Sequence, residues 1–471
     1  MVASETTTRA RVRRSPADAS LSVVDRRWFI GRRLYHSCFG YLGPRFDSAS
    51  LAGWRGGSRE PTKTQDRHVT LRALTPLVLV VATTGVAAAQ GEAGQEPKEA
   101  KTEVGAVPLL GGDSDIGLGG GVLGAVTRLE PGRSPYLWNA DVGGLLTVKP
   151  PNGEHWRVPY QDYYIQLTVP EFFHPNLRLE VRPSYTKETT QSYYGIGNAS
   201  PAPETGPQGQ SQTDYFQYGR IHPTLLIRIR LALGGRFSFL FGNAITYNRL
   251  DIHPGSKLEQ DLGGTVSPHL VHFFEHALLY DRRDSETSTH DGMFHQLKLR
   301  LSPGGTSTFP YQYGQVDGIA RFYVTPIPKW LTIALRLVGD VQFGNPPFYE
   351  LARFEDTFAL GGGKGVRGVP GQRYYGRIKV FGNLETRTDL ATFHLGPKPC
   401  LLGAALFFDA GRLWSDWKPD PQLDGSGLGL KYGVGAGLRL QQGEAFVVRG
   451  DVAWSPDARP IGAYFTAGQT F

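Results

Sequence analysis

The 471-residue sequence is poor in cysteine and methionine, with two of each. Cys38 lies near the N-terminus and Cys400 near the C-terminus, so a chain that loses its N-terminal segment on export cannot form an internal disulfide. Glycine, by contrast, occurs 60 times, and aromatic residues make up 11% of the chain. This composition favours strands and turns over helix bundles.

The sequence also lacks the motifs of several enzyme classes. It contains no His-Glu-x-x-His zinc motif and no Walker phosphate-binding loop. The segment GGDSDIG (111–117) lacks the glycine that a nucleophile elbow requires two residues after Ser114. We therefore predict that the protein is not an enzyme, and we expect no cofactor.

Two further patterns are weak. GGGVLG (119–124) matches the spacing of a dinucleotide-binding loop, but a strand pattern follows it instead of a helix. His269, His272 and His276 would share a face on a helix and could then hold a metal. On a strand, His269 faces away from the other two, which lie about 13 Å apart. The strand interpretation therefore predicts no metal site.

The positive charge of the chain is concentrated at its N-terminus. The formal net charge is +7, but residues 1–72 alone carry 14 basic and 6 acidic side chains. The remainder is close to neutral, which removes the main support for nucleic-acid binding. We predict no nucleic-acid partner.

An export signal follows this basic extension. Arg67, His68 and Arg72 precede the apolar run 73–89, which ends in Ala87-Ala88-Ala89, a small-x-small cleavage site. The run is too short and too interrupted for a membrane anchor. We expect a disordered or wrongly assigned extension at 1–68, a signal peptide at 69–89, a polar linker at 90–104 and one domain at 105–471. A long functional leader is the alternative.

From Ile116 onward, apolar and polar residues alternate. In the stretches 177–182, 227–231 and 297–301, leucine, isoleucine or valine alternates with arginine, glutamate or lysine. A soluble sandwich also alternates, but here the polar faces carry charges and no helical pattern covers a sheet. The pattern predicts an all-β fold, a transmembrane antiparallel β-barrel with its apolar face toward lipid.

The length of the domain indicates the number of strands. At about 23 residues per strand and connection, residues 105–471 allow sixteen strands, and twelve or fourteen remain open. The chain ends in IGAYFTAGQTF, with Phe465 on the apolar face and Phe471 as the last residue. A final strand that ends in an aromatic residue is similar to the signal that barrel-assembly machinery recognises in the C-terminal strand of outer-membrane proteins.

Several segments resemble one family. The block FALGGGKGVRGVPGQRYYG (358–376), then FGNLETRTDL, FFDAGRLW, YGVGAGLRL and GQTF, are similar to the C-terminal barrel of BamA/TamA-type outer-membrane proteins, the bacterial surface antigen family. YDRRDSETSTHDGMF (280–294) also resembles a strand start of that family. The resemblance is strong from about residue 280 onward and implies an extracellular loop folded back into the lumen.

The resemblance also implies a specific contact inside the barrel. Arg367 matches the arginine of the family's Val-Arg-Gly motif, and Glu385 and Asp409 match its partners on the next strands. We call Val366, Arg367, Gly368, Glu385 and Asp409 the lumenal latch, because a buried guanidinium needs carboxylates for its donors. The loop glycines expected to shape its approach are Gly361, Gly362, Gly363 and Gly365. Val369 stands where the family has an aromatic residue, and Tyr374 or Tyr375 is expected to compensate.

The family resemblance implies a function and its setting. It implies a barrel of the bacterial outer membrane that assists insertion or passage of a polypeptide or lipid-like client through a labile seam between its first and last strands. The alternative is a passive pore or structural barrel. Only about 20 residues separate Ala89 from the expected first strand near Gly111, too few for the family's periplasmic repeat modules. The expected partners are outer-membrane lipid, the assembly machinery, and a client or a separate periplasmic protein.

The predicted export signal can be tested on the mature protein. Cleavage after Ala89 should leave a chain that begins at Gln90 and lacks every arginine of the extension. Intact mass and N-terminal sequencing of protein from outer-membrane fractions measure this directly. A mature chain that retains the arginine-rich segment would contradict the assignment of 69–89 as a signal peptide.

Overall fold

The structure is a computed structural model. It describes residues 99–467 except 134–135, 150–155, 204–205, 210, 286–287, 329, 356, 396–397, 443–445 and 458–460. The expected extension, signal peptide and cleavage site, and Phe471, lie outside the described residues. No helix among the described residues is long and apolar enough to cross a membrane.

Almost all regular structure in the described residues is β-strand. The main strands are β1 (Lys101–Asp113), β2 (Gly117–Leu129), β3 (Trp138–Val148), β4 (Tyr160–Pro170), β5 (Leu177–Ser192), β6 (Gln217–Ile221), β7 (Thr224–Gly234), β8 (Phe237–Ile252), β9 (His269–Asp281), β10 (Gly292–Pro303), β11 (Gln312–Ile327), β12 (Leu331–Gly344), β15 (Ile378–Leu395), β16 (Lys398–Trp414), β17 (Lys431–Gln442), β18 (Phe446–Trp454) and β19 (Gly462–Ala467). The short elements are η2 (Pro207–Gly209), α1 (Gln212–Phe216), α2 (Lys257–Leu262), η3 (Phe348–Glu350), β13 (Arg353–Phe354), β14 (Thr357–Phe358) and α3 (Pro421–Asp424).

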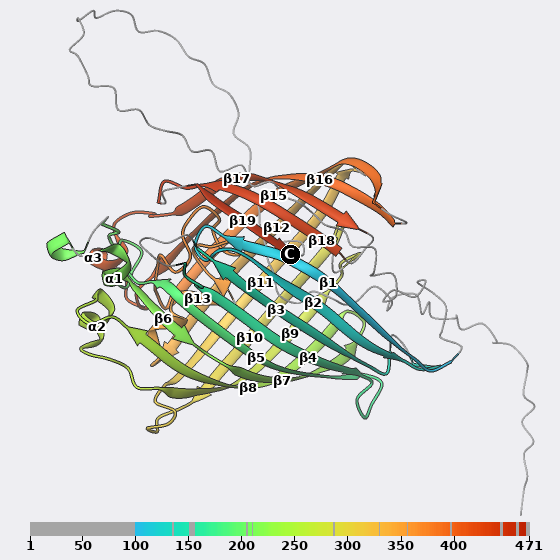
Figure 1. Ribbon diagram of the computed structural model, residues 1–471, viewed down its shortest axis with the longest axis horizontal. Helices are drawn as coiled ribbons and strands as arrows, with labels where there is room; N and C mark the ends of the chain where they lie inside the picture. Colours follow the sequence, from blue (N-terminus) through green and yellow to red (C-terminus); the bar gives the residue numbers. More distant parts are fainter. Residues whose placement is uncertain are drawn as a thin grey trace, which may run out of the picture.

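The main strands form one closed antiparallel sheet (Figure 1). Each strand pairs with its neighbours along the chain, and β1 pairs with β19 to close the ring. Of the 17 strands described in this sheet, β6 and β7 occupy one position in the wall, because both pair with β5 and with β8. The wall therefore has sixteen positions, which confirms the predicted barrel and its strand number.

The break between β6 and β7 has a local cause. Pro223 has no backbone N–H and cannot donate to the ladder. The chain nevertheless stays in the wall, since His222 N donates to Thr186 O at 2.8 Å and Tyr247 N donates to Pro223 O at 3.0 Å. One proline thus divides a wall strand without opening the barrel.

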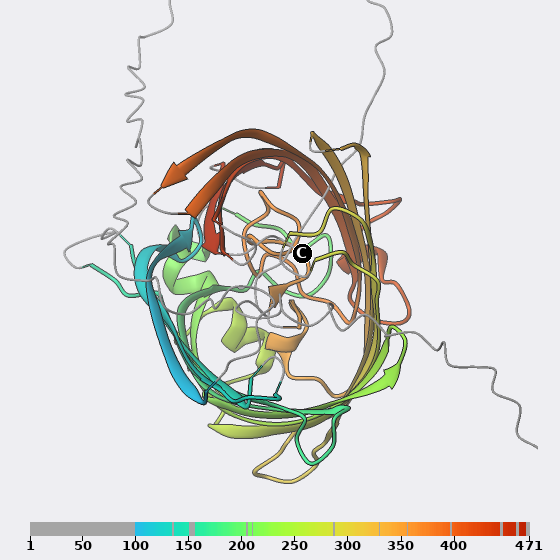
Figure 2. The ribbon, with the colours of Figure 1, turned by 90° about the vertical axis from the view of Figure 1, so that its right-hand side faces the viewer.

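The two faces of the wall differ as the alternation predicts. Apolar side chains on the outside include Ile165, Leu297 and Leu438, which are all exposed. Charged side chains at the alternate positions, such as Arg178, Glu180 and Lys298, line a cavity inside the barrel. The closed sheet is a single ring, and among the described residues no second layer covers its apolar face (Figure 2). Without lipid, this face would leave a continuous apolar band in contact with water.

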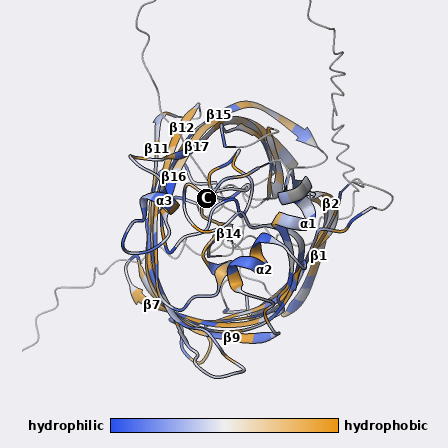
Figure 3. Ribbon diagram, turned by 90° about the vertical axis from the view of Figure 1, so that its left-hand side faces the viewer, coloured by the Kyte–Doolittle hydropathy of each residue, from blue (hydrophilic) through white to orange (hydrophobic). Residues whose placement is uncertain are grey.

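The connections at the two ends of the barrel differ in length. Residues 193–216, 253–268, 345–377 and 415–430 join strands at one end, which we call the long-loop end. The other end, the short-turn end, is joined by connections such as 171–176 and 235–236. Seen from the long-loop end, α2 lies inside the ring of strands (Figure 3), so this end is partly covered by its own loops.

The first strand begins earlier than the sequence suggests. The segment 90–104 was expected to be a linker, but β1 begins at Lys101, and its first four residues pair with Leu129 to Val126 of β2. The segment KTEV (101–104) is mostly polar, so its composition does not indicate a strand, although Val104 is exposed on the outer face as expected for a wall strand. Pairing with a neighbouring strand supplies the backbone partners that composition alone cannot reveal.

The expectation that the outer surface faces lipid leads to a prediction about stability. Leu297 is 59% exposed on the outer face of β10. Leu297→Arg should reduce the free energy of unfolding in phospholipid vesicles by about 2–4 kcal/mol, because the side chain would carry its charge into hydrocarbon. Denaturant titration of the reconstituted barrel measures this, with Leu297→Ile as the volume-matched control. Equal stability of the two variants would show that this face does not contact acyl chains.

Candidate functional site

The lumen is occupied by residues 345–377, which connect β12 to β15 and which we call the inward loop. Figure 2 shows this light-orange segment inside the ring of strands. The loop contains η3 and the two-stranded hairpin β13–β14. Its apolar side chains form a buried cluster with the wall, made of Ile319, Val338, Phe354, Ala359, Leu360, Val366, Val369, Tyr374, Phe381 and Leu413. The loop is therefore packed against the wall and not merely threaded through a channel.

Glycine is required at two positions of the loop. A Cβ on Gly365 would lie 2.4 Å from Phe358 O and 2.6 Å from Ala359 O. Gly368 has φ +91, and a Cβ there would lie 2.9 Å from the backbone of Trp454. Side chains cannot be accommodated at such distances. Gly365 therefore lets the loop fold tightly against itself, and Gly368 lets the loop backbone approach the wall closely.

Arg367 is the centre of the site and is fully buried, with a relative exposure of 0%. Its Nε and Nη2 donate to the two carboxylate oxygens of Asp409 at 2.8 and 3.2 Å, and its backbone N donates to Asp409 Oδ2 at 3.0 Å. Its Nη1 donates to Glu385 Oε1 at 3.2 Å. The guanidinium also stacks on Phe407, 3.4 Å from the ring centroid. The structure thus brings Arg367, Glu385 and Asp409 together.

A third carboxylate completes the shell around Arg367. Asp451 on β18 accepts from Arg367 Nη1 at 3.0 Å, and it also accepts from Arg439 and Arg449. This partner was not predicted from the sequence, although Asp451 lies two positions after Arg449 and therefore on the same polar face of the strand. Burial by itself lowers the pKa of Arg367, but the surrounding carboxylates of Asp409, Asp451 and Glu385 raise it above its ordinary value.

The cluster extends beyond one ion pair. Arg387 Nε donates to Glu385 Oε2 at 2.7 Å, and Arg439 Nη2 donates to Glu385 Oε1 at 2.9 Å. Four guanidinium groups and three carboxylates are thereby joined across β15, β16, β17, β18 and the inward loop. Removing one member leaves its partners buried without compensation, so the cost of a single truncation exceeds that of an exposed pair.

The apolar residues beside Arg367 are also fully buried. Val366 and Val369 have relative exposures of 0% and pack in the cluster that contains Tyr374. Tyr374 also donates its hydroxyl to Asp457 Oδ1 at 3.0 Å. Tyr375 packs in a different cluster, toward the long-loop end. Tyr374 therefore lies where it can supply the apolar area that valine at 369 does not.

A second set of ion pairs ties the loop to the opposite wall. Arg353 Nη2 donates to Glu188 Oε2 on β5 at 2.7 Å, and Lys298 Nζ on β10 donates to Glu355 Oε1 at 2.6 Å. Burial alone would raise the pKa of Glu355, but Lys298 holds it well below its ordinary value. The sequence analysis did not find these contacts. The inward loop is thus bound to both sides of the lumen.

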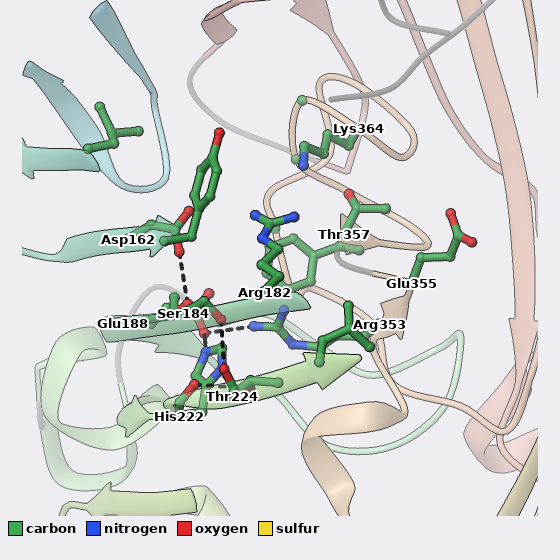
Figure 4. Close-up of a pocket in the computed structure, with 18 of the residues that line it drawn as sticks. Asp162, Arg182, Ser184, Glu188, His222, Thr224, Arg353, Glu355, Thr357 and Lys364 are labelled. Atoms are coloured by element: carbon green, nitrogen blue, oxygen red, sulfur yellow. Dashed lines mark hydrogen bonds and ion pairs between the residues drawn. The ribbon is translucent and has the colours of Figure 1, made fainter. Parts of the chain in front are cut away.

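A cavity of about 770 Å³ remains beside the loop, between it and the wall. Asp162, Arg182, Glu188 and His222 reach it from the wall, while Glu355 and Lys364 reach it from the loop (Figure 4). Charges of both signs face this space, and we call it the charged chamber.

Aromatic residues close the long-loop end above this cavity. Together with aliphatic residues they form one buried cluster, which consists of Tyr193 and Leu258 from the connections after β5 and β8, Tyr218 of β6, Ile252 of β8, and Phe348, Tyr349, Leu351, Ala352 and Tyr375 of the inward loop. We call this cluster the aromatic cap. Tyr218 and Tyr375 also place their hydroxyl oxygens 3.4 Å apart within it.

The edge where β1 meets β19 is the seam of the barrel. In the described residues the seam consists of the pairs Gly112↔Phe465 and Asp113↔Tyr464, with Ser114 N donating to Ala463 O at 3.1 Å. By contrast, β1 pairs with β2 over all thirteen of its residues. Tyr464 is buried inside the barrel, and Phe465, which follows it in β19, is half-buried.

The histidines of β9 do not gather. His269 lies near Tyr349 OH, at 2.8 Å from Nε2, whereas His272 lies near Asn243 Nδ2, at 3.0 Å. Within the described ranges no group of three or more His, Cys, Asp or Glu side chains could hold a metal ion. Residues 119–124 lie inside β2, so the glycines of that segment belong to the wall.

Comparison with known proteins agrees with this geometry. The family model described as the Omp85 superfamily domain matches residues 159–471. A solved structure of BamA from Haemophilus ducreyi lacking POTRA domains 1–3 is similar in fold, with a TM-score of 0.52, 12% identity, and coverage of 79% of this chain and 70% of that chain. CdiB from Escherichia coli is also similar, with a TM-score of 0.50, 15% identity, and coverage of 81% and 67%. No curated protein matches.

The latch itself remains a prediction, which a pair of variants tests. Arg367→Ala should reduce stability by about 3–5 kcal/mol, because it leaves Asp409 and Asp451 buried without their common partner. Lys364→Ala, three residues away in the same loop, should have little effect, since Lys364 faces the cavity. The temperature at which the folded band disappears on semi-native gels measures both. If the folded band disappears at the same temperature in both variants, the latch hypothesis is wrong.

Proposed function

The chain belongs to the Omp85 superfamily, and from this membership and the geometry of its seam we propose that it assists the insertion or passage of a client through the outer membrane. Barrels of this superfamily mediate protein insertion or translocation. The client is a polypeptide, or a lipid-like molecule of similar amphipathic character. Membership in the superfamily indicates the class of activity, and the seam between β1 and β19 is the proposed route of the client.

The short seam is the observation that carries this proposal. Each backbone hydrogen bond contributes about 1 kcal/mol net, so the two residue pairs described between β1 and β19 resist separation far less than the thirteen between β1 and β2. An edge that separates exposes backbone donors and acceptors to the bilayer, where each needs a partner. A client strand that adds to this edge would supply those partners.

The passive-pore alternative is less well supported. An open pore requires a continuous aqueous path, whereas the inward loop crosses the lumen and the aromatic cap covers the long-loop end. A steady single-channel conductance in planar bilayers would favour the pore, and small irregular currents are expected instead. The lateral route through the seam does not require the lumen to be clear.

The proposed location is the bacterial outer membrane, reached through the cleaved export signal at 69–89. In such barrels short turns face the periplasm and long loops face outside, which would place the aromatic cap at the cell surface. We further propose that barrel-assembly machinery inserts the protein by its C-terminal strand, and that a separate periplasmic protein delivers the client.

Locking the seam tests the proposed function. In the double variant Ser114→Cys/Ala463→Cys, the two cysteines replace residues whose backbones are joined across the seam by a hydrogen bond of 3.1 Å. Antiparallel neighbours lie about 5.5 Å apart between Cα atoms, a spacing that suits a disulfide. Cys400 is buried and should not compete. Oxidised protein in liposomes should lose its ability to speed the protease-protected insertion of an unfolded outer-membrane barrel, and reduction should restore it.

Each single variant, treated with oxidant in the same way, is the matched control. If the reduced protein inserts the client no faster than empty liposomes do, the insertion proposal is wrong. If the oxidised double variant is as active as the reduced one, the client does not use the seam.

A further inference from the structure

The tip of the inward loop contacts both edges of the seam. On the β19 side, Gly368 N donates to Tyr464 OH at 2.9 Å. On the β1 side, Gly371 N donates to Asp115 Oδ2 at 2.7 Å, and Asp115 lies in the turn that joins β1 to β2. These two bonds come from positions three residues apart, so the backbone of residues 368–371 bridges the seam from inside the barrel.

The turn that carries Asp115 is held in place by its own contacts. Asp113 Oδ1 accepts from the backbone N of Asp115 at 2.8 Å and from that of Ile116 at 2.9 Å. The ammonium of Lys149, at the end of β3, donates to the carbonyl of Asp115. Because the turn is fixed on β1, β2 and β3, its carboxylate cannot follow the loop if the two sides move apart.

The tip, in turn, belongs to the other side of the seam. Arg367 holds it to Asp409 of β16 and Asp451 of β18, and Gly368 fits closely against the backbone of Trp454. Of the tip contacts just described, the bond from Gly371 to Asp115 is therefore the one that reaches from the β16–β19 side to the β1–β3 side. Separation of β1 from β19 must break it or pull the tip away from Arg367's partners.

We propose that residues 368–371 form a staple that keeps the seam closed, and that Asp115 is the positioning residue through which the staple holds β1. The proposal rests on the proposed function in one respect, since it describes how the opening of the same seam is controlled. The staple couples the position of the inward loop to the state of the seam, through which the client is proposed to pass. Opening of the seam and release of the loop tip become one event.

Electrostatics make the staple sensitive to pH. Burial, together with the neighbouring carboxylate of Asp113, raises the pKa of Asp115 to about 7, while the Gly371 N–H and the Lys149 ammonium oppose this shift. The remaining titratable groups close to Asp115 are the hydroxyls of Tyr464 and Tyr194, from β19 and the connection after β5.

The sign of the pH effect follows from linkage. The closed seam binds the Asp115 proton more tightly than an open seam with a solvated aspartate would. Raising the pH from the ordinary aspartate range toward 7 therefore favours opening, and the effect levels off above the pKa of the closed state. A neutral carboxyl keeps the carbonyl oxygen that accepts from Gly371, so protonation preserves the bond while removing the buried charge.

Hydrogen–deuterium exchange of the reconstituted full-length barrel tests the staple. After correction for intrinsic exchange, the protection of peptides that cover Ser114 and Phe465 should fall on the order of tenfold from about pH 5.5 to about pH 7.5. In Asp115→Asn, which imitates the protonated acceptor, protection should stay high, and its fall with pH should be much smaller than in the wild type, since only the carboxyl of Asp113 still titrates in the turn. In Asp115→Ala, which removes the acceptor, it should be low at every pH.

The controls separate this proposal from a general loss of structure and from the proposed function. Asp162→Asn changes a carboxylate in the same cavity, bonded to Thr186, and should leave the seam profile as in the wild type. Peptides of β12 should be unchanged in all variants. If Asp115→Asn keeps the wild-type pH dependence, or Asp115→Ala keeps full protection, the staple is overturned. Hydrogen–deuterium exchange is measured without a client. If only the client-insertion assay fails, the proposed function is wrong, but the staple proposal is not affected.

Discussion

A guanidinium group buried inside a closed lumen must find carboxylates, and the arrangement of this barrel follows from how Arg367 finds them. Its partners Glu385, Asp409 and Asp451 lie on three different strands. No single strand could supply that shell, so the loop tip can rest only where the closed wall brings the three together. Because an unpaired charge at this depth is costly, the position of the loop is determined by charge as much as by packing.

The position of the loop then decides the shape of the interior. Its tip lies against β16, β18 and β19, while Arg353 and Glu355 bind β5 and β10 on the far side. The loop thus acts as a strut across the lumen and leaves the charged chamber beside it. Above the strut, Phe348 and Tyr349 of the same loop pack into the aromatic cap. One segment therefore connects the seam, the chamber and the cap.

This connection gives the seam two kinds of restraint. The direct restraint is the ladder between β1 and β19, which comprises two residue pairs in the described part of the chain, and the indirect one is the bridge from Gly371 to Asp115. A short ladder alone would leave the edges poorly protected in lipid, where unpaired backbone groups are expensive. The contact between Gly371 and Asp115 stabilises the closed seam without adding residue pairs to the ladder. The seam can therefore be stable when closed and can open without the separation of two fully paired strands.

The sequence by itself determined the two faces of the wall, and its length allowed sixteen strands without excluding twelve or fourteen. The resemblance of its glycine-rich segment to one family then indicated Arg367 as the residue that needs acidic partners. Alternation at period two is a local property, and a buried arginine in a glycine-rich loop restricts its possible partners to carboxylates. Tertiary structure alone decided that Asp451 completes the shell, that β1 begins at Lys101, and that Asp115 meets Gly371. Those contacts join residues 84, 28 and 256 positions apart. Only the closure and register of the barrel bring such residues together, and neither can be read from any one strand.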